Sequence, residues 1–177
     1  MSGPVARADR PPTICEVAYG SAQYDACCRL REQVLRVPQW MSLRPEDVAG
    51  EERQIHLAAV VGQTVVGCVV LKPLGEMAED ATDATDAADA ADAAPRGRAV
   101  KLRQMAVAAT HQRRGVGSAL VRHAIQAAAA RGFATMTMDA RTSAEAFYER
   151  LGFACEGERY EIIGLPHVRM TQTLPRS

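Results

Sequence analysis

Residues 111–120 read HQRRGVGSAL, and this stretch decides the fold to be expected. An apolar strand pattern precedes it at 99–107, and an alanine-rich helix pattern follows it at 116–131. Gly115 and Gly117 lack Cβ atoms, so a ligand can approach the backbone closely at both positions. The first N–H groups of a helix have no partner within the helix, and the helix dipole adds partial positive charge there. A strand, a Gly-rich turn and a helix in this order therefore predict a site for a diphosphate group.

Two nucleotide-binding motifs are excluded at this loop. The sequence lacks the GxxxxGK[ST] pattern of a Walker P-loop, and Leu120 stands where a Rossmann fingerprint requires its third glycine. The pattern that fits is Gln/Arg-x-x-Gly-x-Gly/Ala, with Gln112, Gly115 and Gly117 at its fixed places. A pair of arginines before the first glycine adds formal positive charge at the mouth of the predicted site.

The composition is that of one globular domain with an uneven charge distribution. The 177 residues are 47% hydrophobic and 24% charged, with 21 basic and 21 acidic side chains. Residues 76–94 hold seven acids and no Lys or Arg, whereas residues 95–138 hold eight Lys or Arg and no acid. A small anionic ligand and a solvated basic face explain the basic stretch equally well. A nucleic-acid partner is disfavoured, because it requires many phosphate contacts and no basic–aromatic interleaving is present.

Cysteine usage and hydropathy predict a cytoplasmic protein. The five cysteines form no CxxC pair and have no His spacing typical of a metal site, so we expect free thiols and no metal. Cys68 and Cys155 fall in apolar strand patterns, where a thiol is a poor nucleophile. Residues 1–12 lack the apolar core of a signal peptide, and the apolar run at 65–71 is too short to span a membrane.

The element pattern predicts a disordered tail at 1–12 and a single α/β domain at 13–177. Residues 76–97 interrupt this domain as an acidic low-complexity insertion with Asp at every third position, for which a mobile loop is favoured over a transient helix. Ser21 is the expected N-cap of the helix at 21–36, and Gly132 is the expected stop of the helix at 116–131. Thr142 and Glu145 have the spacing of a capping box. The remaining patterns predict strands at 14–19, 55–61, 64–72, 99–107, 134–140, 154–163 and 167–174, and helices at 21–36, 116–131 and 144–151.

Three segments together resemble the GNAT N-acetyltransferase superfamily: the loop at 112–117, LRQMAV at 102–107 and AFYERLGF at 146–153. LREQVLRVP at 30–38 and GLPHVRM at 164–170 are similar to a bacterial subgroup of undefined substrate. The resemblance implies a mixed, mostly antiparallel twisted sheet of six to seven strands with about four helices. It also implies that two central strands splay apart and admit the pantetheine of acetyl-CoA, the expected cosubstrate.

The resemblance also implies residue roles. Tyr148 would be the general acid that protonates the leaving thiolate, whereas Phe147 and Leu151, four residues apart, form the expected core pair of their helix. A backbone N–H of Val107 or Met105 would polarise the acetyl carbonyl. The expected cofactor-binding residues are Met105, Ala106, Val107, Gln112, Arg113, Arg114, Gly115, Val116, Gly117, Ser118 and Phe147.

The chain departs from the family at the general base. Gln104 stands on the strand where many members carry a glutamate, and an amide cannot accept the proton of the amine. Candidate bases are Glu32, His56, Asp139 and His167, of which we assign His167 a catalytic role, although a hydrogen-bonded surface histidine fits it equally well. Water is a further candidate, and His56 is expected to be structural. Met136 and Met138 are expected in the core, and the loop residues Arg36, Gln39, Trp40 and Met41 are candidates for a substrate wall.

The sequence thus predicts an enzyme that transfers an acetyl group from acetyl-CoA to a primary amine of a small molecule or peptide. No activated nucleophile is present in the patterns, so direct attack in a ternary complex is expected. The alternative is a non-catalytic module that binds acyl-CoA and acts as a sensor or regulator. A monomer and a homodimer both remain open, and no nucleic-acid or membrane partner is expected.

Overall fold

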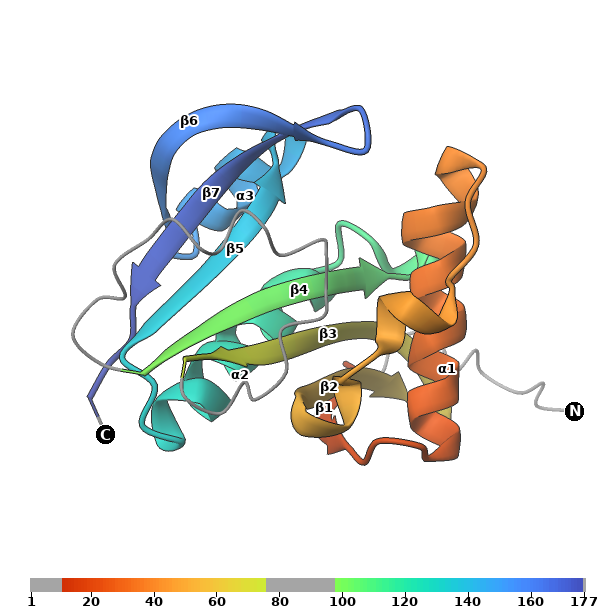
Figure 1. Cartoon of the computed structure of the whole chain (residues 1–177). Coiled ribbons are helices and arrows are strands. Elements are labelled where there is room, and N and C mark those ends of the chain that lie inside the picture. The colour runs from red at the N-terminus through yellow and green to blue at the C-terminus, as the bar shows by residue number, and fades with distance from the viewer. Residues whose placement is uncertain (1–10, 76–97, 177) are drawn as a thin grey trace, which may run out of the picture.

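The structure is a computed structural model that describes residues 11–75 and 98–176 (Figure 1). The predicted acidic insertion and nearly all of the predicted tail lie outside these ranges. The strands are β1 (Thr13–Val17), β2 (Ile55–Val61), β3 (Thr64–Leu74), β4 (Ala99–Val107), β5 (Thr135–Arg141), β6 (Ala154–Ile162) and β7 (Leu165–Thr173). The α-helices of the described residues are α1 (Ala22–Arg31), α2 (Val116–Ala130) and α3 (Glu145–Glu149).

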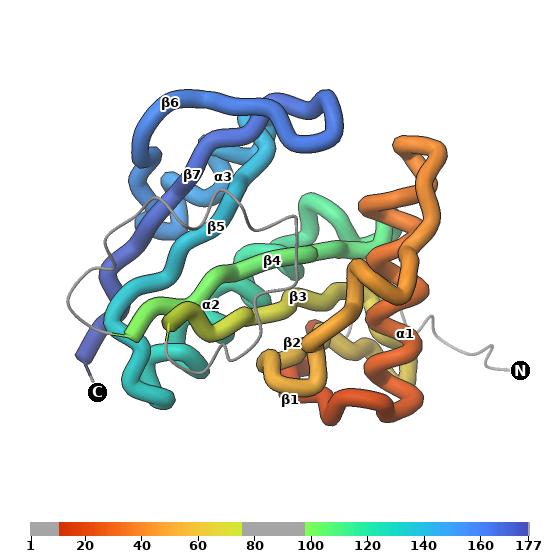
Figure 2. The backbone as a smooth tube through the Cα atoms, in the orientation of Figure 1, coloured from red at the N-terminus to blue at the C-terminus, as the bar shows by residue number. Residues whose placement is uncertain are grey.

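The strands form one mixed sheet in the order β1-β2-β3-β4-β5-β7-β6. Only β4 and β5 run parallel, because α2 connects them as a crossover, and every other neighbouring pair is antiparallel. The β4–β5 ladder extends only from Ala99↔Thr135 to Lys101↔Thr137. Beyond that point the two strands diverge, as Figure 2 shows. The predicted fold class, including the splayed central pair, is confirmed.

Helices cover both faces of the sheet and create two apolar layers. Leu57 and Ala59 of β2 lie in the layer with α2, whereas Ala58 between them lies in the layer with α1. Successive strand side chains point to opposite faces, so a strand covered on both faces is apolar at consecutive positions. This explains the unbroken apolar run at the end of β2. Met136 and Met138, at 0% and 2% exposed, are core residues as expected.

A glycine in β3 allows α2 to approach the sheet closely. A Cβ at Gly67 would lie 2.9 Å from Cδ1 of Leu120 and 3.2 Å from Cγ1 of Val116. Real Cβ atoms essentially never show the shorter of these contacts. The absence of a side chain at Gly67 therefore lets the first turns of α2 pack against β3, next to the point where β4 ends.

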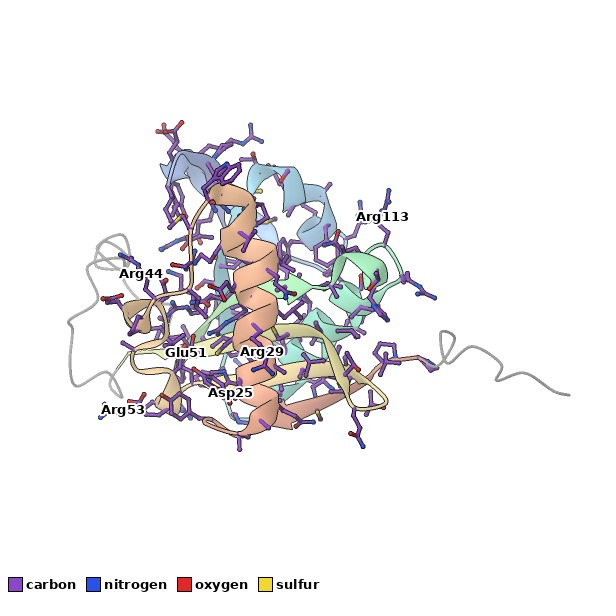
Figure 3. All side chains as sticks on the ribbon, turned by 90° about the vertical axis from the view of Figure 1, so that its right-hand side faces the viewer. Asp25, Arg29, Arg44, Glu51, Arg53 and Arg113 are labelled. Carbon is purple, nitrogen blue, oxygen red and sulfur yellow. The ribbon has the colours of Figure 1, made fainter. Side chains whose placement is uncertain are left out.

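A buried ion pair fixes α1 against the segment that precedes β2. Nη1 of Arg31 lies 2.9 Å and 3.0 Å from the two carboxylate oxygens of Glu51, and the Tyr24 hydroxyl donates a hydrogen bond of 2.8 Å to the same carboxylate. Nε2 of His56 lies 2.7 Å from the Glu51 carbonyl oxygen, which supports the structural role expected for this histidine. Figure 3 shows Glu51 beside α1. Arg31 and Glu51 are 1% and 0% exposed, and the sequence patterns did not reveal their pairing.

Two local expectations are tested at helix starts. Ser21 caps α1 as predicted, because its hydroxyl accepts a hydrogen bond of 3.2 Å from the Tyr24 N–H. The capping box predicted for Thr142 and Glu145 is wrong. Residues 142–144 form a 3-10 turn without a side-chain cap, and Glu145 instead pairs with Arg159 at 2.9 Å. The described residues include no helix that is both long and apolar enough to cross a membrane.

Candidate active site

The loop between β4 and α2 leaves a row of backbone N–H groups without acceptors. Arg113 and Gly115 adopt left-handed conformations, with φ of 57° and 81°, and turn the chain into the helix. Gly115 is the N-cap and has no side-chain cap, and the first helical hydrogen bond runs from the Ala119 N–H to the Gly115 carbonyl at 3.0 Å. Among the described residues, the N–H groups of Val116, Gly117 and Ser118 therefore have no carbonyl partner. This arrangement suits an anionic ligand.

Apolar side chains from two other elements lie against this helix start. A Cβ at Gly117 would lie 3.4 Å from Cζ of Phe147 in α3 and 3.7 Å from Cε of Met105 in β4. The first turn of α2, the end of β4 and α3 are thus brought together, as the sequence predicted. Arg113 and Arg114 are exposed, and Figure 3 shows Arg113 extending outward at the edge of the molecule. Both arginines are placed where they can meet an anion at the helix start.

A bulge in β4 lies just beyond the point where this strand leaves β5. Gln104 has a φ of 52°, and the pairing of β4 with β3 shifts register at the same place. Past the bulge, the Ala108 N–H bonds to the Val66 carbonyl of β3 at 2.9 Å. Because backbone groups alternate between the two sides of a strand, those of Val107 face the gap toward β5. Nε2 of Gln112 donates to the Val107 carbonyl at 2.9 Å, which leaves the Val107 N–H as a candidate donor in the gap.

The gap between β4 and β5 opens into a cleft of about 340 Å³. Its walls come from β4, β5, α3, the β6–β7 hairpin and the segment that follows α1. Tyr148, His167, Gln104 and Met105 all line it, so the structure places both predicted catalytic residues in one cavity. Arg103 and Arg141 also line it, and neither was assigned to the site from the sequence. The available signal was the pair Lys101 and Arg103 at alternate positions of β4, together with Arg141 at the end of β5.

Tyr148 lies at the inner side of this cleft. It is 7% exposed and packs its ring edge-on against Phe147 and Phe153, with centroid distances of 4.9 Å and 5.9 Å. Burial raises the pKa of Tyr148 to about 12. No described residue hydrogen-bonds its hydroxyl, which is thus available to a ligand. We expected Phe147 and Leu151 to be the core residues of this segment, and that expectation is wrong. Tyr148 is buried, whereas Phe147 and Leu151 are only partly buried.

The candidate bases have different surroundings. His167 is 9% exposed, and its Nδ1 lies 2.7 Å from the Leu165 carbonyl oxygen. That contact fixes the proton on Nδ1 in the neutral ring and leaves Nε2 as an acceptor. The carboxylate of Glu32 accepts a hydrogen bond of 3.3 Å from the Leu43 N–H. Of these two, only His167 lines the cleft.

Asp139 lines the cleft but is strongly paired. Burial alone would raise its pKa, but a hydrogen bond from Tyr160 and the positive charges of Lys101 and Arg169 outweigh that effect and lower the pKa. Nζ of Lys101 lies 3.0 Å from its carboxylate, and the Tyr160 hydroxyl donates a short hydrogen bond to it. A carboxylate held in the ionised form by this many partners is a weak proton acceptor.

Gln104 has a structural partner. Its Nε2 donates to the Asp47 carbonyl at 3.1 Å, while its Oε1 is buried without a hydrogen-bond partner among the described residues. Arg36 and Gln39 line the cleft, whereas Trp40 is 99% exposed and is not among the lining residues. Of the residues expected to form a substrate wall, Arg36 and Gln39 therefore line the cleft, whereas Trp40 and Met41 do not.

The two cysteines expected in apolar strands, Cys68 and Cys155, differ in their exposure to solvent. Cys68 is 2% exposed in the α1 layer, as expected. Cys155 is exposed on β6, and its thiol donates to the Glu145 carboxylate at 3.3 Å, so the expectation of an apolar environment is wrong for this residue. Neither thiol lines the cleft.

The comparisons with known proteins agree with this geometry. Residues 23–153 match the sequence profile of the acetyltransferase (GNAT) family. A proposed N-acetyltransferase from Lactobacillus plantarum superposes with a TM-score of 0.74 at 19% identity, covering 94% of this chain and 100% of the other. An acyl-CoA N-acyltransferase from Pseudomonas aeruginosa superposes with a TM-score of 0.65 at 20% identity, covering 91% and 97%.

A proposed acetyltransferase of Bacillus subtilis (strain 168) is 28% identical over 76 residues. That match covers 43% of this chain, and the chain spans about half, 52%, of the length of this relative. Because the family profile matches most of the chain, this protein belongs to the acetyltransferase (GNAT) family. The family and the fold support transfer of an acyl group from an acyl-CoA.

Proposed function

We propose that this protein transfers the acetyl group of acetyl-CoA to a primary amine by direct attack within a ternary complex. The observation that carries the proposal is the row of open N–H groups at Val116, Gly117 and Ser118, at the start of a helix that packs beside the β4–β5 gap. Tyr148, which follows Phe147 in the helix α3 beside this helix start, lines the cleft. A diphosphate held by the helix start would direct an extended thioester into the gap.

The residues that would hold acetyl-CoA come from β4, the loop that follows it, the start of α2, and α3. The N–H groups of Val116, Gly117 and Ser118 would bind the diphosphate, with Arg113 and Arg114 supplying charge at the entrance. The remaining contacts would come from Gln112 and Gly115 in the loop, from Phe147 in α3, and from the strand residues Met105, Ala106 and Val107. The cosubstrate supplies the thioester carbonyl that the amine attacks.

Each reacting atom has a proposed partner. In the overall step an N–C bond forms, the C–S bond breaks, the amine loses one proton and the sulfur gains one. The Val107 N–H, or alternatively that of Met105, would stabilise the charge that develops on the carbonyl oxygen. Tyr148 would donate to the sulfur, and Nε2 of His167 or a water would accept the proton of the amine.

The raised pKa of Tyr148 limits how far its proton moves. A phenol with a pKa of about 12 is a weaker acid than a free thiol with a pKa near ~8.5, and this difference opposes complete transfer by roughly 5 kcal/mol. A thiol in the same apolar environment also has a raised pKa, which reduces that cost. We expect Tyr148 to hydrogen-bond the developing thiolate first and to complete proton transfer as the products separate.

A non-catalytic acyl-CoA sensor is the second candidate. It is favoured by Gln104, which stands where many members carry an acid and donates to the Asp47 carbonyl at 3.1 Å. Thiol release from acetyl-CoA across a panel of amines separates the two functions. Release with any amine supports the transferase, whereas tight binding without release from any amine supports the sensor.

Two substitutions test the proposed site. Gly117→Asp places a carboxylate where the diphosphate should lie, so acetyl-CoA affinity measured by calorimetry should fall by at least tenfold. Gln126→Asp adds the same charge to an exposed position of α2 and should have little effect. An affinity that Gly117→Asp leaves unchanged would exclude the predicted diphosphate site.

Tyr148→Phe removes only the hydroxyl. We expect kcat to fall by about 10² or more, with a smaller change in KM for acetyl-CoA. Tyr19→Phe, at a residue that is 49% exposed, is the matched control. If kcat stays unchanged while single-turnover measurements show that chemistry limits the rate, Tyr148 is not the acid.

A further inference from the structure

The cleft presents positive charge on one face of the splayed strands. Leu102 of β4 and Ala140 of β5 lie in the α2 layer, so their neighbours Arg103 and Arg141 point to the opposite face. Arg103 lies two residues beyond Lys101, the last residue of β4 that pairs with β5. On that face, α1 lies beside the β1–β4 half of the sheet rather than over β5 and β7 (Figure 1).

Arg103 and Arg141 have no acidic partner among residues 11–75 and 98–176. Both are partly buried, both line the cleft, and no described residue forms an ion pair or hydrogen bond with either guanidinium group. A third lining arginine, Arg36, pairs with Asp47 at 3.1 Å, but its Nε is buried and has no hydrogen-bond partner among the described residues. Three arginines thus line one cavity of about 340 Å³.

The acid that lines the cleft does not balance this charge. Asp139 is neutralised by Lys101 at 3.0 Å and by Arg169 at 4.0 Å, and neither of these cations lines the cleft. The lining side chains therefore leave an excess of positive charge. Walls of low dielectric constant concentrate such a field within a cleft.

We propose that the acceptor is a small amine that also bears a carboxylate, and that Arg103 and Arg141 bind this carboxylate. This inference rests on the proposed transferase function and specifies its acceptor. The planar fork of a guanidinium group matches a carboxylate in two parallel hydrogen bonds, whereas an ammonium group near two cations is repelled. An amine without an anionic group therefore gains little from this cavity.

The same charge compensates for the missing base at Gln104. Positive charge near a bound amine disfavours its protonated form and lowers its pKa, so a larger fraction binds as the neutral nucleophile. Removal of the first proton then occurs in solution before binding. Nε2 of His167 or a water is sufficient for the proton released after attack.

Two measurements, one of acetyl-CoA binding and one of amine acetylation, test this inference separately from the proposed function. Calorimetry with acetyl-CoA measures cosubstrate binding alone. Thiol release is then measured with the common L-amino acids and with the matching L-amino acid amides, which lack only the carboxylate. We expect acetyl-CoA to bind and at least one amino acid to be acetylated with kcat/KM at least tenfold above that of its amide.

Arginine variants assign the effect to the cleft. Arg103→Gln and Arg141→Gln should each raise KM for the preferred amino acid by roughly tenfold or more, with little change for the amide. Arg29→Gln removes an exposed cation of α1 (Figure 3) that does not line the cleft, and it should change neither KM. Acetyl-CoA affinity in all three variants should match that of the wild type.

Three results would overturn the inference. If amides are acetylated as efficiently as amino acids, the carboxylate is not recognised, but the transferase function stands. If both arginine variants keep the wild-type preference, the carboxylate binds elsewhere. If acetyl-CoA binds but no amine releases thiol, the transferase function fails and the inference fails with it.

Discussion

The buried ion pair between Arg31 and Glu51 leads to the sharpest stability prediction. Glu51→Gln preserves the volume of the side chain and removes its charge. Arg31 is 1% exposed and would be left as an uncompensated buried cation, and the Tyr24 hydroxyl would lose a charged acceptor 2.8 Å away. Breaking a buried pair by removing one partner costs about 3–5 kcal/mol.

Urea denaturation followed by circular dichroism measures this cost. With an m-value of about 2 kcal/mol/M for a domain of this size, the expected loss lowers the midpoint by roughly 1.5–2.5 M. Glu52→Gln is the matched control, since Glu52 belongs to the same 3-10 turn but its side chain is 50% exposed. We expect the control to change stability by no more than about 0.5 kcal/mol.

A double substitution separates the charge from the packing. Arg31→Met with Glu51→Leu replaces both ions by apolar side chains, and we expect it to recover most of the stability lost by either single change. The reasoning is refuted if Glu51→Gln costs less than about 1 kcal/mol. It is also refuted if the double variant is as unstable as the sum of the two single variants, because stability would then depend on the packing of these side chains rather than on an unpaired charge.

Three further predictions follow from single contacts. Gly67→Ala should destabilise the fold by about 1–3 kcal/mol in the same urea assay, since its Cβ would lie 2.9 Å from Leu120; an unchanged midpoint would show that α2 can shift without cost. Ser21→Ala removes the cap of α1 and should cost about 1 kcal/mol by thermal denaturation, with wild-type stability as the contrary result. The pKa of Tyr148, raised to about 12 by burial, keeps the phenol protonated, so kcat should show no alkaline decline from this group below about pH 11. A decline centred near pH 10 that Tyr148→Phe abolishes would contradict that pKa.

Residues near one another in the sequence account for what could be predicted. The order of strands and helices followed from local periodicity and from stop signals such as Gly132 after α2. The open helix start at Gly115 and Gly117 also followed from local chemistry, because a glycine-rich turn before an apolar helix produces unpaired N–H groups in any tertiary setting. The Ser21 cap was predictable for the same reason.

Only the tertiary structure decided the environment of the site. Tyr148 is buried because α3 packs in the apolar layer that also contains residues of α2, β5 and β7. Glu51 meets Arg31 although the two residues lie 20 positions apart in the sequence. Arg103 and Arg141 line one cavity because β4 and β5 separate after Lys101. Each of these contacts forms between two elements that are distant in the sequence. The residue pattern of either element alone therefore cannot predict it. The sequence by itself determined the open N–H groups at the start of α2, whereas packing between distant elements decided which charged side chains line the cleft.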